Sequence, residues 1–456
     1  MSESRLIDRR TFMRRGAMGA GAFWALSLGE LAARKKYGVV KKGPSPYGDP
    51  VPTLDATTGL PLLLLPEGFR YLSFGWTGDP MNDGVRTPGA HDGMAVIDTL
   101  FGNPNWLVLV RNHEQGGGAP FISNRPDITY GPNPAAGGTT NLIFDTSQER
   151  FLKANSSLAG TTTNCAGGVT PWHTWITCEE SDGGGHGWSF DVGLFSGDPA
   201  PIVDMGRFRH EACMVDPASG WVYQTEDNGT SSGFYRFIPN VAGQLKEGGQ
   251  LQMLKVRGAS NVLVTLGSPL GTTWEVEWVP IADPRATTRS VFNQGQDLGA
   301  ARFRRLEGCW WGNNTGFFLA TEGGGSLNGQ VFEFDPLAQT IKLIYESPTH
   351  NDLDNPDNMV VTPRGGIILC EDQAAGSNFT LGERMIGLQM HGEVFTFAQN
   401  NVILPVAYND RVPAGNYTGG EFAGACYSPD GQWLFVNIQS PGITFAITGP
   451  WGTGPL

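Results

Sequence analysis

The chain repeats one short pattern five times, and this repeat limits its possible fold more than any other feature. Each copy opens on a polar residue, runs apolar, turns at Pro, Gly, Asp or Asn, runs apolar again and closes on a polar residue 14 to 16 positions after the first. A looser sixth copy runs from Asp92 to Asn112. The five regular copies are NCAGGVTPWHTWITCEE from Asn164, EACMVDPASGWVYQTED from Glu211, EGCWWGNNTGFFLATEG from Glu307, DNMVVTPRGGIILCED from Asp357 and EFAGACYSPDGQWLFVN from Glu421.

This spacing predicts a β-hairpin in each copy, because two strands of about five or six residues around a tight turn have that length. Further strand-like runs follow several copies, such as GFYRFIP, GQVFEFDP and GEVFTFA. Repeated units of four antiparallel strands are typical of a β-propeller. We therefore predict an all-β fold, a six-bladed β-propeller with an insertion at about residues 257–300, between the third and fourth blades. The run GFRYLSFG, at residues 68–75, is a candidate strand for closing the ring.

Composition agrees with this fold class and excludes one class of partner. Sixty-four glycines, 31 prolines and 16% charged residues favour many short strands over long helices. The formal net charge is −13, and no stripe of Lys and Arg follows the first 42 residues. We therefore expect no nucleic-acid partner. The acidity fits a protein that collects cations, and it fits an ordinary acidic surface equally well.

The N-terminus has the pattern of an export signal. Arg9 and Arg10 precede Phe12, and a Gly/Ala-rich apolar run extends from Gly16 to about Leu28. A run this short is a signal segment and not a membrane span. The paired arginines are typical of twin-arginine export, which moves folded proteins.

The predicted organisation is therefore simple. Residues 1–42 form a twin-arginine signal peptide and linker, and residues 43–456 form a single β-propeller domain. We expect a periplasmic or extracellular protein that uses the twin-arginine export machinery. It would have no stable membrane span after processing.

Acidic residues dominate the ends of the predicted hairpins. Both ends of a hairpin lie at one edge of its sheet, so these residues should meet at one mouth of the propeller channel. There they would repel one another unless protonated or bridged by cations. Oxygen ligands suit Ca²⁺, whereas a Cys178 thiolate would suit a transition metal such as iron; core packing is the competing interpretation of Cys178. The acidic residues are Asp92, Glu114, Glu179, Glu180, Glu211, Glu226, Asp227, Glu307, Glu322, Asp357, Glu371, Asp372 and Glu421.

Five stretches between about residue 65 and residue 451 form a specific combination: CAGGVTPWHTWITCEE, HEACMVDPASGWVYQTED, RLEG, NPDNMVV and EFAGACYSPDGQWLFVNIQSPGITFAITGPW. Together they resemble the PhoX-type alkaline phosphatases. The resemblance implies a six-bladed propeller, exported by the twin-arginine route, that hydrolyses phosphomonoesters with calcium and iron at the channel mouth. Two positions depart from the family pattern: His173 stands where Gly is common, and Ala212 follows Glu211 where the family has Gly.

The resemblance also implies roles for individual residues. The TCEE motif makes Cys178 an iron ligand, and the R-x-E-G motif makes Arg305 a phosphate contact and Glu307 a metal ligand. The implied catalytic residues are Arg305 and Glu307, and the implied ions are Ca²⁺ and Fe³⁺. The implied metal ligands are Cys178, Glu179, Glu211, Glu307, Asp357, Asn358, Glu371 and Glu421.

We therefore predict a metal-dependent phosphomonoesterase, an alkaline phosphatase that releases inorganic phosphate from small-molecule phosphate esters. No Ser-His-Asp triad, Walker loop or dinucleotide fingerprint stands out in the sequence. One alternative is a calcium-dependent propeller hydrolase of another class, lactonase or phytase-like, which needs neither iron nor Cys178. The other is a non-catalytic, calcium-stabilised propeller that binds a protein.

Overall fold

The structure is a computed structural model that describes residues 42–122, 124–131, 134–194, 198–373 and 382–456. The predicted signal segment lies outside the described residues, apart from Lys42. Within these ranges, no helix is both long and apolar enough to span a membrane. The prediction of an all-β fold is confirmed: the described part of the chain is built from β-strands, and its one α-helix is the seven-residue α3 (Val291–Asp297).

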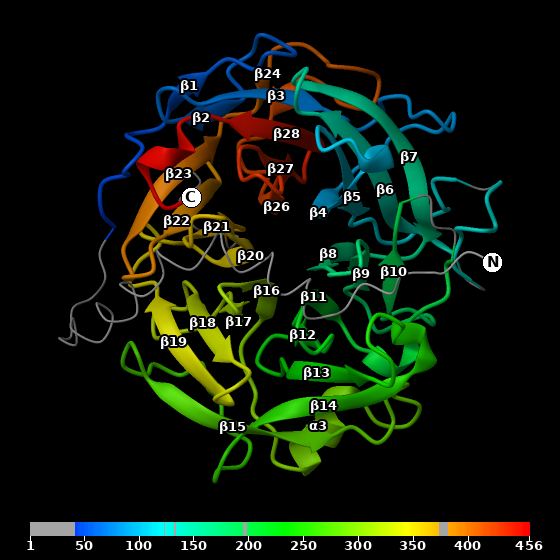
Figure 1. The fold of residues 1–456 in the computed structure, drawn as a ribbon, viewed down its shortest axis with the longest axis vertical. Helices are drawn as coiled ribbons and strands as arrows, with labels where there is room; N and C mark the ends of the chain where they lie inside the picture. The colour runs from blue at the N-terminus through cyan, green and yellow to red at the C-terminus, as the bar shows by residue number, and fades with distance from the viewer. Residues whose placement is uncertain (1–41, 123, 132–133, 195–197, 374–381) are drawn as a thin grey trace, which may run out of the picture. The chain divides into compact units, whose positions relative to one another are not determined.

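Antiparallel sheets make up the fold (Figure 1). One sheet contains β4 (His91–Thr99), β5 (Trp106–His113), β6 (Ala135–Asp145) and β7 (Arg150–Gly160). The next contains β8 (Asn164–Val169), β9 (Trp175–Glu179) and β10 (Ser189–Val192). A six-stranded sheet contains β20 (Pro356–Val361), β21 (Ile367–Glu371), β22 (Arg384–Leu388), β23 (Val394–Asn400), β2 (Leu63–Leu65) and β1 (Val51–Thr53). A small sheet pairs β24 (Ile403–Leu404) with β25 (Gly415–Asn416).

The chain closes on itself through an early strand. The last sheet contains β26 (Phe422–Tyr427), β27 (Leu434–Ile438), β28 (Ile443–Thr448) and β3 (Arg70–Phe74). Strand β3 pairs with β28 from Phe74 opposite Thr444 to Arg70 opposite Thr448. This is the strand predicted to close the ring, and it ties the start of the described chain to its end.

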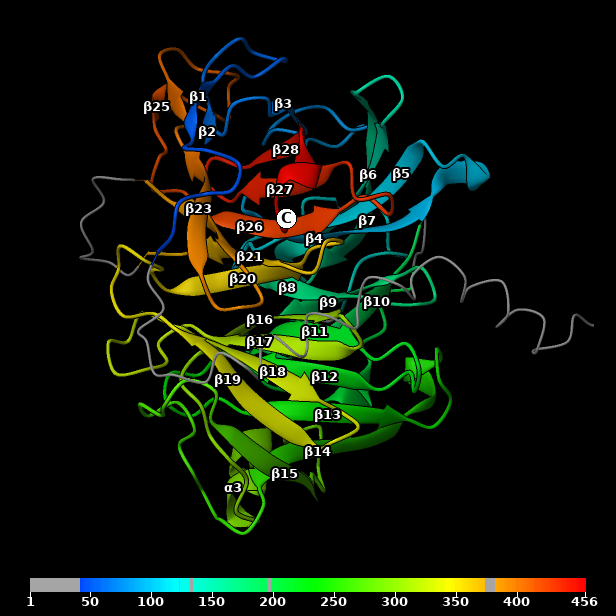
Figure 2. The same cartoon turned by 60° about the vertical axis from the view of Figure 1, so that its left-hand side comes forward.

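A nine-stranded sheet departs from the predicted separate blades. It contains β11 (His210–Val215), β12 (Val222–Glu226), β13 (Phe234–Pro239), β14 (Gly249–Val256), β15 (Thr273–Pro280), β19 (Thr340–Glu346), β18 (Gln330–Asp335), β17 (Thr315–Ala320) and β16 (Leu306–Gly312). Strand β15 comes from the predicted insertion and pairs with both β14 and β19 (Figure 2). Because β15 satisfies the outer edges of both strands, the third and fourth repeats share one sheet.

The first strands of the six predicted hairpins form a closed ring, and each hairpin is present. Strand β4 contacts β8, β8 contacts β11, β11 contacts β16, β16 contacts β20, β20 contacts β26, and β26 returns to β4. The fold is thus propeller-like. Apolar side chains fill the spaces between neighbouring sheets, for example Phe395, Phe422 and Phe445 between the last two sheets.

Small residues let these inner strands approach closely. A Cβ atom added at Gly93 of β4 would lie 2.6 Å from the Cα of Ala166 and 2.7 Å from the carbonyl oxygen of Cys165, both in β8. Backbone atoms cannot move aside as a flexible side chain can. The packing of the ring therefore depends on glycine at this position.

We expect Gly93→Ala to lower the free energy of unfolding by about 1–3 kcal/mol, because overpacking must displace backbone. Urea unfolding followed by tryptophan fluorescence measures the change. Gly183→Ala is the matched control, since nothing lies within 4 Å of an added Cβ there, and its effect should stay within about 0.5 kcal/mol. Equal stabilities of the two variants would contradict the close approach of β4 and β8.

Candidate metal centre

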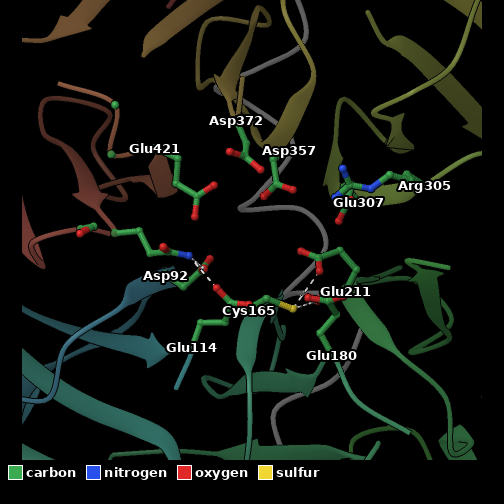
Figure 3. Close-up of a pocket in the computed structure, with 14 residues that line it drawn as sticks. Asp92, Glu114, Cys165, Glu180, Glu211, Arg305, Glu307, Asp357, Asp372 and Glu421 are labelled. Atoms are coloured by element: carbon green, nitrogen blue, oxygen red, sulfur yellow. Dashed lines mark hydrogen bonds and ion pairs between the residues drawn. The ribbon is translucent and has the colours of Figure 1, made fainter. Parts of the chain in front are cut away.

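One polar cavity of about 290 Å³ collects residues from all six hairpins (Figure 3). Its lining includes eight carboxylates, one thiol and one guanidinium, and no aromatic or aliphatic side chain. The labelled side chains of Figure 3 converge on a common space. The lining residues are Asp92, Glu114, Cys165, Glu180, Glu211, Arg305, Glu307, Asp357, Asp372, Gly419, Gly420, Glu421, Gln439 and Ser440.

A β-bulge at the start of each inner strand supplies the first set of these residues. In β4, β8, β11, β16 and β20 the pairing register shifts directly after the first paired residue. A bulge bends its strand and re-aims a side chain. In all five strands the residue that follows the first pair lines the cavity: Asp92, Cys165, Glu211, Glu307 and Asp357.

The second strand of four of the six hairpins supplies the other set, from the position just after its last paired residue. Glu114, Glu180, Asp372 and Gln439 occupy this position and line the cavity. In the sixth hairpin the bulge of β26 comes later in the strand, after Ala423. Its cavity carboxylate is instead Glu421, which precedes the strand.

Two predicted ligands, Glu179 and Glu371, do not reach the cavity. Each lies one position before a cavity residue, and successive side chains of a strand point to opposite faces. Glu371 forms a two-point ion pair with Arg384, with both N···O distances 2.6 Å. Both carboxylates are paired with other groups and lie outside the cavity that four other predicted ligands share.

Glu179, like Glu371, has its partners outside the cavity. Its carboxylate is fully buried and accepts hydrogen bonds from the backbone N–H groups of Thr162, Gly187 and Trp188, at 2.8–3.1 Å. The Nδ1 atom of His186 lies 2.7 Å from the Oε1 atom of Glu179. Backbone and imidazole contacts thus occupy this carboxylate.

The sulfur of the cavity belongs to Cys165, whereas Cys178, the predicted iron ligand, lies outside it. Cys178 is fully buried in an apolar cluster, with its Sγ 3.7 Å from the Oγ of Ser189. The Sγ of Cys165 lies 2.8 Å from Oε2 of Glu211. The pairing register equates Cys165, not Asn164, with Glu211, so the cavity residue of the copy that starts at Asn164 lies one position later than the repeat pattern indicates.

A sequence signal for the correct alignment exists. A small residue follows the cavity residue in four of the inner strands, namely Gly93, Ala166, Ala212 and Gly308. Asn358 follows Asp357 in β20 and, like these small residues, lines a separate, smaller space between the inner strands. Its prediction as a metal ligand is therefore not supported by its position. The predicted residues Glu211, Glu307, Asp357, Glu421 and Arg305 do meet in the cavity, whereas Cys165 and Gln439 were missed.

Three groups of side chains in the described chain have the size of a metal site. Within each group the potential ligand atoms all lie within 4.8 Å of one another. One group contains a sulfur and two use only carboxylate oxygens. The groups are Cys165–Glu180–Glu211, Glu211–Glu307–Asp357 and Asp92–Glu114–Glu421.

The electrostatics of the cavity favour cation binding. Burial, together with neighbouring carboxylates, raises the pKa values of Glu211, Glu307 and Glu421 well above the ordinary value of a glutamate. Burial and the carboxylate of Glu211 likewise raise the pKa of the Cys165 thiol. The Oε1 atom of Glu211 is buried without a hydrogen-bond partner among the described residues. A bound cation would satisfy this oxygen and remove the repulsion, so the donors present fit metal ions.

Arg305 lies at one side of the cavity. Its Nη2 donates to Oε1 of Glu307 at 2.7 Å, and its Nε donates to Oδ2 of Asp227 at 3.3 Å. Burial alone would lower the pKa of Arg305, but these two carboxylates raise it above its ordinary value. The guanidinium is therefore charged and fixed in place. A second arginine, Arg209, pairs with Glu180 and donates from Nε to the carbonyl oxygen of Asp227.

We expect the metal-depleted protein to lose stability between about pH 4 and about pH 8. Burial first, and then Glu180, raises the pKa of Glu114 to about 7; burial and Asp372 raise that of Asp357 to about 8. In the unfolded chain both titrate near pH 4. The folded state therefore holds more protons in this window, and the free energy of unfolding falls as pH rises.

Urea unfolding in a chelator at a series of pH values measures this dependence. Excess Ca²⁺ should flatten it, and Asp357→Asn should make it shallower because one titrating group is removed. A chelated protein whose stability stays constant or rises over this window would contradict the account.

Comparison with known proteins places the chain in context. The family model described as alkaline phosphatase PhoX matches residues 47–155 and 132–442. No curated protein matches the chain.

Solved structures with a similar arrangement are distant in sequence. A Bacteroides thetaiotaomicron protein of unknown function is 13% identical, with a TM-score of 0.44. The match covers 82% of this chain and 74% of the Bacteroides chain. A gluconolactonase from Xanthomonas campestris is 13% identical with a TM-score of 0.37, over 91% and 99%. A pyranose dehydrogenase PQQ domain from Coprinopsis cinerea is 12% identical with a TM-score of 0.38, over 85% and 97%. At TM-scores this low, these similarities carry no argument about function.

Proposed function

The chain belongs to the family of alkaline phosphatase PhoX, and on that premise we propose that it is a metal-dependent phosphomonoesterase that releases inorganic phosphate from small phosphate esters. One observation carries the proposal. Eight carboxylates and a thiol gather in a single cavity with one arginine at its side. Such a cavity can hold several cations, and cations with an arginine are suited to a phosphoryl group.

The donor types suggest how cations would be shared. The group with Cys165 combines sulfur and oxygen, which suits iron, whereas Asp92, Glu114 and Glu421 offer oxygen alone, which suits Ca²⁺. We infer Fe³⁺ and Ca²⁺ as the ions. When bound, they supply charge neutralisation and Lewis acidity for phosphoryl transfer.

The residues of the chain itself orient the ester. Glu307 and Asp227 occupy Nη2 and Nε of Arg305, so Nη1 remains to donate to a phosphoryl oxygen. The partly exposed carboxylate of Glu322 lies 3.9 Å from Nη1. Because the guanidinium is already held, binding a phosphoryl group requires little further ordering of this side chain. The polar lining suits the phosphoryl group and offers no aromatic or aliphatic side chain to the organic part of the ester.

Two further inferences belong to the same proposal. We infer six blades, with the third and fourth sharing a sheet through β15, and we regard residues 257–300 as the insertion between them. We also propose export by the twin-arginine machinery to the periplasm or the cell exterior, on the strength of Arg9, Arg10 and the apolar run that follows.

Cys165→Ala tests the proposed function, with Cys178→Ala as its matched control. We expect Cys165→Ala to lose bound iron and to hydrolyse p-nitrophenyl phosphate about 100-fold more slowly or worse, since even changes to residues that only support ligands cost about 10–100-fold. Cys178→Ala should keep its metals and its activity. Elemental analysis of the purified proteins and the rate of nitrophenol release measure both.

The contrary results are specific. Loss of metal in Cys178→Ala but not in Cys165→Ala would contradict the assignment of the thiol. A wild-type protein that contains calcium without iron and leaves the aryl phosphate intact would contradict the phosphatase. Cleavage of a lactone by that protein would then support the alternative hydrolase.

Arg305→Gln tests phosphate binding separately from metal binding. We expect kcat/KM for the aryl phosphate to fall about 100–1000-fold, because one preorganised donor to the transferred group is lost, while the metal content stays unchanged. Arg257→Gln is the control, since Arg257 lies outside the cavity and forms an exposed ion pair with Glu275 and a hydrogen bond to the carbonyl oxygen of Val276. Wild-type kinetics in Arg305→Gln would rule out the proposed phosphate contact.

A further inference from the structure

We propose that Gln439 is a positioning residue that holds Asp92, Glu114 and Glu421 in the arrangement that one oxygen-bound cation requires. The inference rests on the proposed function, because it concerns one of the cation groups of that site. It adds a residue that offers no charge itself and that lies in the last hairpin of the chain.

Gln439 contacts all three members of this group. Its side-chain Nε2 donates to Oε2 of Glu114 at 2.6 Å and to Oδ2 of Asp92 at 3.3 Å. Its backbone N–H donates to the carbonyl oxygen of Glu421 at 3.1 Å. No other described residue makes a hydrogen bond to all three. Gln439 thereby connects the last hairpin, which contributes Glu421, to the first, which contributes Asp92 and Glu114.

The position of Gln439 in the repeat explains why an amide stands there. Four of the other five hairpins place an acid just after the last paired residue of their second strand: Glu114, Glu180, Asp227 and Asp372. The sixth hairpin places Gln439 at this position. A carboxylate there would face Glu114 and Asp92 as a further like charge, and like charges repel more strongly at a partly buried site than in bulk water.

An amide at this position makes the contact with the two carboxylates attractive instead of repulsive. Its N–H₂ group supplies two donors, and each carboxylate that accepts one keeps its other oxygen for a cation. If residue 439 were an ionised glutamate, Asp92 and Glu114 would receive no hydrogen bond from its side chain. Gln439 therefore stabilises the two carboxylates at close range before a cation arrives, in the way that outer residues orient the ligands of metal sites.

A comparison of Gln439→Met with Gln330→Met tests this role. Methionine keeps the length of glutamine and removes its donors. Gln330 is the matched control because its amide also donates to a carboxylate, Glu346, at 2.7 Å, but outside the cavity. Calorimetric titration of Ca²⁺ into the chelator-treated full chain gives the affinity directly, and the Ca²⁺ dependence of aryl phosphate hydrolysis gives a second readout.

We expect Gln439→Met to weaken one class of Ca²⁺ site about 10–100-fold. The Ca²⁺ concentration for half-maximal activity should rise by the same factor, while kcat at saturating Ca²⁺ is retained. Gln330→Met should match the wild type in both. Should Gln439→Met fail to fold, Gln439→Asn serves instead, since its shorter amide cannot reach Glu114 from the same backbone position.

Unchanged Ca²⁺ affinity in a folded Gln439→Met protein would overturn this inference alone. So would a loss of kcat or thermal stability without a shift in the Ca²⁺ midpoint, because that pattern marks a purely structural residue. A wild-type protein that binds no Ca²⁺ would overturn the proposed function and this inference with it.

Discussion

Repulsion among eight carboxylates in one cavity is the constraint on which the rest of this structure depends. Two unit charges 4 Å apart interact by about 4 kcal/mol at an effective dielectric constant of about 20, so several such pairs rival the net stability of a domain. The chain meets this constraint with fixed donors at the cavity, Arg305, Arg209 and Gln439, and with cations in the proposed state. In the absence of cations, burial first and then this repulsion raise the pKa of Glu211 and of Glu307.

The two adjacent acids at the end of a second strand have different partners. The first acid of each pair turns into the sheet and accepts hydrogen bonds: Glu179 from three backbone N–H groups, Glu226 from Tyr235, and Glu371 from Arg384. The second acid faces the cavity or, in Asp227, holds Arg305. Strand alternation thus lets two adjacent carboxylates serve opposite purposes. One anchors the strand end, and the other supplies charge to the site.

The sequence predicted the architecture of the fold better than it predicted which residues line the cavity. Hairpin spacing predicted all six hairpins, the closing strand β3 and the gathering of acids at one mouth, because periodicity and turns are local properties. It missed β15 as a bridge between repeats, since pairing to distant edges leaves no local pattern. The family resemblance, and not the spacing, implied Cys178, Glu179 and Glu371. Glu179 and Glu371 each precede a cavity residue by one position, and Cys178 lies in the strand that pairs with the strand of Cys165. A bulge shifts the facing of a strand by a single position, and only the pairing register shows that Cys165 is the counterpart of Glu211.

The central claim is that the cavity-lining residues at the hairpin ends, and not the neighbouring Cys178, Glu179 and Glu371, hold cations. Anomalous X-ray diffraction from crystals of the exported protein, with data collected above and below the iron edge and at long wavelength for calcium, tests it most directly. The account predicts an iron peak beside Cys165 and Glu211 and a calcium peak among Asp92, Glu114 and Glu421. Peaks beside Cys178, Glu179 or Glu371, or a cavity without any anomalous signal, would contradict it.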